Sequence, residues 1–217
     1  MNELLSPAGS LEAFYAAISN GADAIYLGLD KFSARAYAEN FSSSSLKDLL
    51  NFAHLRKVKI YVTVNTLIYD EELNDVYSSL EFLASIGVDA VIIQDLAVLH
   101  YLTSHYESIL PHASTQMGVD DVDAAKLLKE LGFKRVVLAR ETPLPVIKEI
   151  KNKANIEVEA FIHGALCVSY SGNCYMSSAL GERSGNRGRC AGCCRKYYSL
   201  IIRKDYKCHK QTKALPP

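Results

Sequence analysis

The last quarter of this 217-residue chain concentrates the residue types that hold metals or act as nucleophiles. All six cysteines lie within Cys167–Cys208, and the first 166 residues contain none. Six residues separate Cys167 from Cys174, and a C-x-x-C pair, Cys190 and Cys193, follows. Cysteines that serve only as core packing would be scattered along the chain. The clustering therefore indicates a local use for thiols.

Four kinds of chemistry would use such thiols. Structural zinc needs four thiolates or imidazoles, usually as two close pairs, and only Cys190 and Cys193 form one. An iron–sulfur cluster favours a loop rich in small residues, and residues 164–192 hold six of the 12 glycines. A nucleophilic cysteine needs a base, and His163 lies near Cys167. Disulfides are uncommon in the cytoplasm. These considerations do not choose between a zinc site and an iron–sulfur cluster.

A cytoplasmic protein is expected, because the N-terminus has no basic start followed by an apolar run. No stretch approaches the roughly 20 apolar residues of a membrane span, so no membrane partner is expected. Charge is uneven: residues 183–217 carry ten Lys/Arg and one acidic residue, although the net charge is zero. This basic end is either a solvated tail or a docking site for an anionic partner.

The first 165 residues alternate seven strand-like runs with six helical patterns. The expected strands are 3–9, 24–29, 59–65, 90–95, 109–115, 135–139 and 157–164. The expected helices are 10–21, 45–58, 70–87, 96–106, 121–132 and 144–153, the first capped by Ser10. The strands are apolar nearly throughout, as in sheets buried on both faces. Strict alternation predicts an α/β fold with a parallel sheet.

The sheet is expected to close as a (β/α) TIM-like barrel. A doubly wound sheet usually carries G-x-G-x-x-G in its first turn, which "SPAGSLEA" lacks. Barrels instead place functional side chains at the carboxyl ends of many strands. Five strand ends here carry polar groups: Asn65, Gln94–Asp95, Ser114–Gln116, Arg140–Glu141 and His163.

The barrel is predicted to be incomplete at the C-terminus. Three regions are expected: a barrel core at 1–165, a cysteine- and arginine-rich segment at 166–200 over the strand ends, and residues 201–217. The only remaining apolar run, "SLII", spans residues 199–202 at the start of the last region, and a polar tail follows it. Either that run closes the barrel as an eighth strand, or the chain stops before closure, with a disordered or truncated tail.

The segment "EAFIHGALCVSYSGNCYMS" resembles the signature of the collagenase-like peptidase family, numbered 32 among peptidases of unknown mechanism. The matching positions are Glu159, Phe161, Gly164, Ala165, Leu166, Cys167, Gly172, Cys174, Met176 and Ser177. "GERSGNRGRCAGCCR" is similar to a second run of the family, and residues 3–29 and 32–41 resemble its N-terminal half. The resemblance covers the chain to about residue 200.

The resemblance implies two different activities. Some members are described as proteases, including collagen-degrading ones. Others carry a 4Fe-4S cluster and hydroxylate a tRNA uridine, a ribosomal RNA cytidine or the ubiquinone ring, with prephenate as a possible co-substrate. It implies cluster ligands Cys167, Cys174 and Cys190, with Cys194, Cys208 or no residue as the fourth.

RNA, in particular tRNA, is the partner we expect, because clustered thiols and a basic end suit a redox protein acting on an anionic polymer. Catalytic roles are assigned to Arg183 and Arg187, which would clamp the carboxylates of an acid, and to His163 and Glu141. The residues expected to bind substrate are Asn65, Gln94, Gln116, Arg35, Asn186 and Arg195.

Two alternatives to RNA hydroxylation are a peptidase, using paired carboxylates Glu141 and Glu159, and a non-catalytic accessory subunit. The sequence contains neither H-E-x-x-H nor G-x-S-x-G, which many hydrolases use. An accessory subunit would work in a homo-oligomer or with a second family member.

Overall fold

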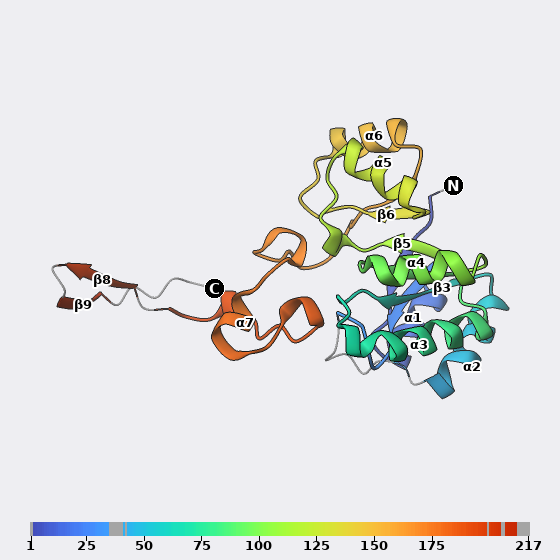
Figure 1. Cartoon of the computed structure of the whole chain (residues 1–217), viewed down its shortest axis with the longest axis horizontal. Coiled ribbons are helices and arrows are strands. Elements are labelled where there is room, and N and C mark those ends of the chain that lie inside the picture. The colour runs from blue at the N-terminus through green and yellow to red at the C-terminus, as the bar shows by residue number, and fades with distance from the viewer. Residues whose placement is uncertain (1, 35–40, 42, 199, 205–206, 212–217) are drawn as a thin grey trace.

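The computed structural model describes residues 2–34, 41, 43–198, 200–204 and 207–211 (Figure 1). Seven parallel strands form one sheet in the order of the sequence. They are β1 (Leu5–Pro7), β2 (Ala24–Gly28), β3 (Lys59–Val64), β4 (Ala90–Ile93), β5 (Leu110–Ala113), β6 (Arg135–Val137) and β7 (Glu157–Glu159). Within this sheet β1 and β7 each have one neighbour, so the barrel is open between them. The predicted incomplete (β/α) barrel is confirmed.

Six helices connect the strands and cover the outer face of the sheet (Figure 1). They are α1 (Leu11–Ser19), α2 (Ser43–His54), α3 (Leu73–Ile86), α4 (Leu96–His105), α5 (Val122–Leu131) and α6 (Leu144–Lys153). As predicted, Ser10 caps α1: its hydroxyl accepts a hydrogen bond from the backbone N–H of Ala13. Asp95 and Asp121 cap α4 and α5 in the same way.

The strands bury both faces, and β3 shows how. Ile60, Val62 and Val64 point outward into the main core, where they pack with the helices. Tyr61 points inward and belongs to a smaller cluster inside the barrel. Successive strand residues face opposite sides, so one apolar run supplies both clusters. The inward positions are therefore the ones that can build a site.

The segment after β7 leaves the barrel and lies to one side of it (Figure 1). It contains α7 (Met176–Gly181), short 3-10 turns at Tyr170–Gly172, Gly185–Arg187 and Cys193–Arg195, and strands β8 (Leu200–Lys204) and β9 (Lys207–Gln211). β8 pairs antiparallel with β9 in a separate two-stranded sheet. The run considered as an eighth barrel strand thus finds its partner locally and does not close the barrel.

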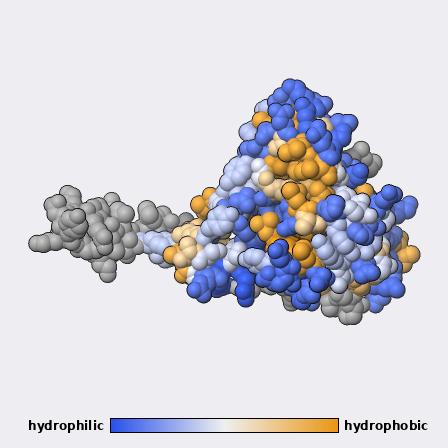
Figure 2. Space-filling model, viewed as in Figure 1, coloured by the Kyte–Doolittle hydropathy of each residue, from blue (hydrophilic) through white to orange (hydrophobic). Residues whose placement is uncertain are grey.

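The surface seen in Figure 2 is mostly polar over the barrel, with a band of apolar residues below the α5–α6 pair. Among helices in the described ranges, none has both the length and the apolar composition needed to cross a lipid bilayer.

Candidate functional site

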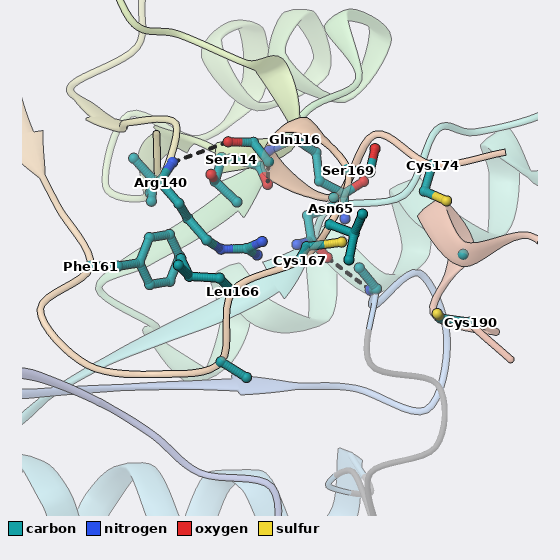
Figure 3. A pocket seen from close by; sticks show the side chains of 18 of the residues that line it. Asn65, Ser114, Gln116, Arg140, Phe161, Leu166, Cys167, Ser169, Cys174 and Cys190 are labelled. Carbon is teal, nitrogen blue, oxygen red and sulfur yellow. Dashed lines mark hydrogen bonds between the residues drawn. The ribbon is translucent and has the colours of Figure 1, made fainter. Parts of the chain in front are cut away.

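A cavity of about 490 Å³ lies where the carboxyl ends of the strands meet the cysteine-rich segment (Figure 3). The barrel contributes inward side chains such as Tyr26, Thr63 and Ile92. The segment contributes Leu166 and Met176 from the opposite side. This is the end of a parallel barrel at which active sites are found.

Three amides expected to orient a substrate are joined by hydrogen bonds. Gln94 Nε2 donates to the backbone carbonyl of Asn65 at 2.7 Å and to Gln116 Oε1 at 2.9 Å. Asn65 Oδ1 accepts from the backbone N–H of Ala34 at 2.9 Å. Asn65 and Gln116 line the cavity, and Gln94 supports them from behind. The three strand ends β3, β4 and β5 are thereby connected.

Arg140 supplies a positive charge to the cavity. Its guanidinium carbon lies 5.1 Å from the centre of the Phe161 ring, and both side chains line the cavity (Figure 3). Among the described residues, no hydrogen bond or ion pair to this guanidinium is formed; only its backbone N–H is engaged, by Ser171 Oγ. A cation held on an aromatic face with its donors unused is suited to binding an anion.

Glu159 lines the cavity and lies at the junction with a buried charge network. Its Oε2 is 3.5 Å from Arg135 Nη1, yet it accepts no hydrogen bond from any described residue. Burial raises the pKa of Glu159 to about 7, although the Arg135 charge opposes the shift. A carboxyl group with this pKa can give or take a proton near neutral pH.

The network below Glu159 joins Glu3, which lies just before β1, to side chains of β3, β5 and β6. Arg135 Nη1 and the Tyr61 hydroxyl both donate to Glu3 Oε1, at 2.6 and 2.7 Å. Burial tends to raise the pKa of Glu3, but these hydrogen bonds outweigh burial and lower it to about 2. The His112 ring packs edge-on against Tyr61 at 4.8 Å, and neither ring nitrogen has a partner among the described residues. Burial lowers the pKa of His112 to about 3.

The four cysteines assigned as ligands, Cys167, Cys174, Cys190 and Cys194, all line this cavity. Figure 3 shows Cys174 and Cys190 at one end, with Cys167 nearer to Arg140. Gly185 lies against both Cys174 and Cys190. A Cβ at this position would lie 3.5 Å from the Cys174 carbonyl oxygen and 3.8 Å from Cys190 Cβ. Within the described ranges, no three His, Cys, Asp or Glu side chains converge closely enough to hold a metal ion.

The surroundings of the sulfur atoms nevertheless suit thiolates. The backbone N–H of Met176 points at Cys174 Sγ, and that of Gly192 at Cys190 Sγ, each at 3.4 Å. Hydrogen bonds of this kind stabilise negative charge on metal-bound sulfur. Soft donors, small residues and these N–H groups fit an iron–sulfur cluster, and they also fit zinc.

Cys193, the cysteine without an assigned role, is buried next to Ser177. The Ser177 hydroxyl lies 3.8 Å from Cys193 Sγ and 4.0 Å from Cys190 Sγ, and it accepts from the backbone N–H of Ala191 at 3.0 Å. Cys208 lies in β9, outside the barrel, opposite Arg203 in the hairpin. Cys194, one of the two candidates for the fourth ligand, lines the cavity.

Arg187 does not have the place expected for a clamp on an acid. Its guanidinium pairs with Glu72, donates to the Leu67 carbonyl at 2.6 Å and stands 4.7 Å above the Tyr69 ring. The Glu72 pKa is lowered, because hydrogen bonds from the Tyr69 backbone and from Arg187 outweigh burial. Arg187 therefore attaches the cysteine-rich segment to the loop after β3.

Glu141 is exposed, and its carboxylate accepts hydrogen bonds from the Ser171 backbone N–H (2.9 Å) and hydroxyl (2.7 Å). Burial opposes the shift, but these bonds lower the pKa of Glu141. Glu159 lines the cavity, whereas Glu141 is not among the described residues that line it. The paired-carboxylate arrangement is thus replaced by a contact that positions the segment.

The other assigned residues have mixed positions. Arg195 lines the cavity and donates to the Leu166 carbonyl at 2.8 Å. Asn186 Oδ1 accepts from the Cys174 backbone N–H at 3.1 Å, so it shapes the cysteine loop. His163 and Arg183 are exposed and do not line the cavity. Arg35 lies outside the described residues.

Arg140 and Glu159 line the cavity. From the sequence, Arg140 had no catalytic or binding role, and Glu159 had a role only in the peptidase alternative. Arg140 was visible only as one of several polar strand ends. Glu159 carried a stronger signal, because a glutamate at an inward strand position must be buried and its pKa perturbed.

Comparison with known proteins places these features in a family. A sequence profile described as peptidase family U32 matches residues 9–215. A 23S rRNA 5-hydroxycytidine synthase of Escherichia coli (strain K12) is 44% identical over 198 residues, which cover 91% of this chain and 30% of that protein. The tRNA hydroxylation protein P1 of Bacillus subtilis (strain 168) is 38% identical over 198 residues, covering 91% of this chain and 47% of that protein. This chain spans less than half the length of either relative.

Among solved structures, the U32 peptidase Mk0906 is similar with a TM-score of 0.63 and 15% identity, covering 74% of this chain and 68% of that one. At this identity the likeness supports the fold alone. The profile match, together with two relatives above 35% identity that cover nine-tenths of the chain, confirms the resemblance seen in the cysteine segment. The chain belongs to peptidase family U32.

Proposed function

We propose that this chain forms the barrel of an RNA-modifying enzyme that hydroxylates a pyrimidine, a tRNA uridine, with an iron–sulfur cluster. The observation that carries the proposal is that Cys167, Cys174, Cys190 and Cys194 line the same cavity as the polar strand ends. The names of the two relatives, one for rRNA and one for tRNA, support the reaction class.

The four cavity cysteines are the proposed ligands of a 4Fe-4S cluster, with zinc as the alternative. We propose that the sulfur atoms of these four cysteines come together around the bound metal. When bound, such a cluster supplies one-electron redox chemistry and an iron able to act as a Lewis acid. The chain itself contributes N–H donors at Cys174 and Cys190, and Glu159 as a group able to hold a proton near neutral pH.

A carboxylic acid that donates oxygen, such as prephenate, is the proposed co-substrate. Arg140, rather than Arg187, would bind its carboxylate, because the Arg140 side chain lines the cavity and its guanidinium forms no hydrogen bond or ion pair with a described residue. Phe161 and Leu166 add apolar surface beside it. A cation next to an apolar wall suits an acid with an unsaturated ring.

The rim of the cysteine-rich segment is the proposed contact for RNA. Arg183, Arg189 and Lys196 are exposed there and can contact phosphates. Tyr175 and Tyr197, 74% and 72% exposed, offer faces on which bases can stack. The excess of positive charge in residues 183–217 agrees with this assignment.

The test is to purify the chain without oxygen, incubate it with tRNA and prephenate, and analyse the nucleosides by mass spectrometry. A hydroxylated pyrimidine that depends on Cys174, as shown by Cys174→Ala, supports the proposal. Cleavage of gelatin or peptides without a modified nucleoside would replace it with the peptidase alternative. Product that forms only when a second family member is added would make the chain an accessory subunit.

A further inference from the structure

Ser177 is a buried serine that lies beside two cysteines of the cysteine-rich segment. It is 3% exposed and belongs to α7. A serine in a helix often donates to the carbonyl four residues before it. Here that carbonyl, of Asn173, accepts from the Ser169 hydroxyl at 2.7 Å, and within the described residues Ser177 does not bond to it. A buried hydroxyl left without a partner is costly, so the Ser177 hydrogen must be used elsewhere.

The described partners of the Ser177 hydroxyl are one backbone N–H and two sulfur atoms. The Ala191 N–H donates to Ser177 Oγ at 3.0 Å. Cys190 Sγ lies 4.0 Å from Ser177 Oγ, in a geometry in which the hydroxyl is the donor. Cys193 Sγ lies at 3.8 Å, and there either atom can be the donor. A hydroxyl accepts two hydrogen bonds and donates one, so its single hydrogen serves only one of the two sulfur atoms.

The positions of the two cysteines decide which sulfur atom receives this hydrogen. Cys193 is 8% exposed and is not among the described residues that line the cavity, so it is not placed to bind a metal there. A thiol without a metal keeps its own hydrogen, which it can donate to Ser177 Oγ. Cys190 lines the cavity and, as a metal ligand, would be a thiolate that only accepts. The Ser177 hydrogen is therefore left for Cys190.

We propose that Ser177 is a positioning residue of the cluster site, whose hydroxyl donates a hydrogen bond to the sulfur of metal-bound Cys190 and raises the reduction potential of the cluster. The inference rests on the proposed function and deepens it by naming a side chain that sets the redox property of the site. The Gly192 N–H already points at Cys190 Sγ at 3.4 Å, so Ser177 is a second donor to the same atom.

The direction of the effect follows from charge. A reduced cluster carries one more negative charge than the oxidised one, and part of that charge lies on the ligand sulfur atoms. A donor at one of these atoms stabilises the reduced form more, and hydrogen bonds to sulfur help to set the potentials of such clusters. The 4.0 Å separation is at the long end for a hydrogen bond to sulfur. The bond is therefore proposed for the thiolate, because a charged acceptor forms shorter and stronger hydrogen bonds than a neutral one.

The experiment is a redox titration with dithionite of the iron-loaded chain, purified without oxygen and followed by electron paramagnetic resonance. Ser177→Ala removes the hydroxyl, and Ser177→Thr keeps one at the same position. Ser178→Ala is the matched control, because Ser178 is the next residue of α7 and its hydroxyl forms no hydrogen bond with a described residue. Iron content and far-ultraviolet circular dichroism are measured for every variant.

The unaltered chain, Ser178→Ala and Ser177→Thr are expected to share one midpoint potential. In Ser177→Ala the iron content should be unchanged, and the equilibrium constant for reduction should fall by about tenfold, which is about 59 mV for one electron. An unchanged or raised midpoint in Ser177→Ala, an equal fall in Ser178→Ala, or no recovery in Ser177→Thr would overturn the inference. Loss of iron from Ser177→Ala would also overturn it, because the hydroxyl would then be a folding contact.

The unaltered chain separates this inference from the function on which it rests. If the unaltered chain binds no iron, the proposed function and the role of Ser177 are both refuted. If it binds a cluster whose midpoint does not respond to Ser177→Ala, only the role of Ser177 is refuted.

Discussion

Replacing Glu159 by glutamine tests the electrostatics of the cavity floor, because it removes the charge and keeps the shape. The pKa of Glu159 is about 7 in the folded chain against an ordinary value of 4.5. Folding therefore takes up a proton between these values, and the wild type loses stability as pH rises from about 4.5 to about 7. The loss is complete above pH 7.

The size of the effect follows from the shift. A difference of about 2.5 pKa units at about 1.4 kcal/mol per unit gives roughly 3 kcal/mol. The side chain is 18% exposed, so little solvent screening is expected. Glu159→Gln should therefore gain roughly 3 kcal/mol relative to wild type between pH 4.5 and pH 8, and about none of this gain is expected below pH 4.5.

The assay is urea unfolding followed by far-ultraviolet circular dichroism at several pH values, with equal metal content in all samples. Glu130→Gln, exposed on α5, controls for the loss of one negative charge. The contribution of His112 is present in both proteins and cancels in the difference. A difference between Glu159→Gln and wild type that does not change with pH would refute a buried carboxyl group whose pKa is raised by burial.

Three further predictions address the network, the segment and the ligands. His112→Phe should make the free energy of unfolding less dependent on pH on the acid side. The pKa of His112 is about 3 in the folded chain and 6.5 in the unfolded chain, so the wild type loses up to roughly 5 kcal/mol of stability as pH falls between these values. The same unfolding assay measures this loss. Arg187→Ala and Glu72→Ala should each speed proteolysis of the cysteine-rich segment. A double-mutant cycle on the free energy of unfolding should give a coupling energy of about 1 kcal/mol between the two residues. If the two single effects simply add, Arg187 does not attach the segment through Glu72. Cys194→Ser should lower the iron content of anaerobically purified protein while Cys193→Ser keeps it, and the reverse order would exchange the two assignments.

Most of the barrel could be predicted from the sequence because its signals are local. Strands buried on both faces are continuous apolar runs, and Ser10 sits one residue before an amphipathic pattern, where a cap is needed. Such local signals did not predict whether residues 200–204 would join the barrel or form a separate hairpin. An apolar run of that length suits a barrel strand or a hairpin strand equally, and the nearby β9 decided between them.

The site was harder, because its contacts join residues far apart in the chain. Arg187 and Glu72 are 115 positions apart, and nothing local distinguishes an arginine that binds substrate from one that attaches a loop. Likewise the charge network of Glu3 and Arg135 depends on strand register, which brings β1 and β6 to the same interior. The cysteines could be singled out as a group because their clustering is itself a local signal, and the structure places Cys167, Cys174, Cys190 and Cys194 at one cavity.

The most direct test of the account is the metal content and spectrum of the chain purified without oxygen, since the account depends on four cavity cysteines holding one iron–sulfur cluster. Iron and sulfide near four per chain, with a broad absorbance near 400 nm that is lost in a Cys174→Ala, Cys190→Ala double variant, is the predicted result. Stoichiometric zinc, or iron that the double variant retains in full, would contradict it.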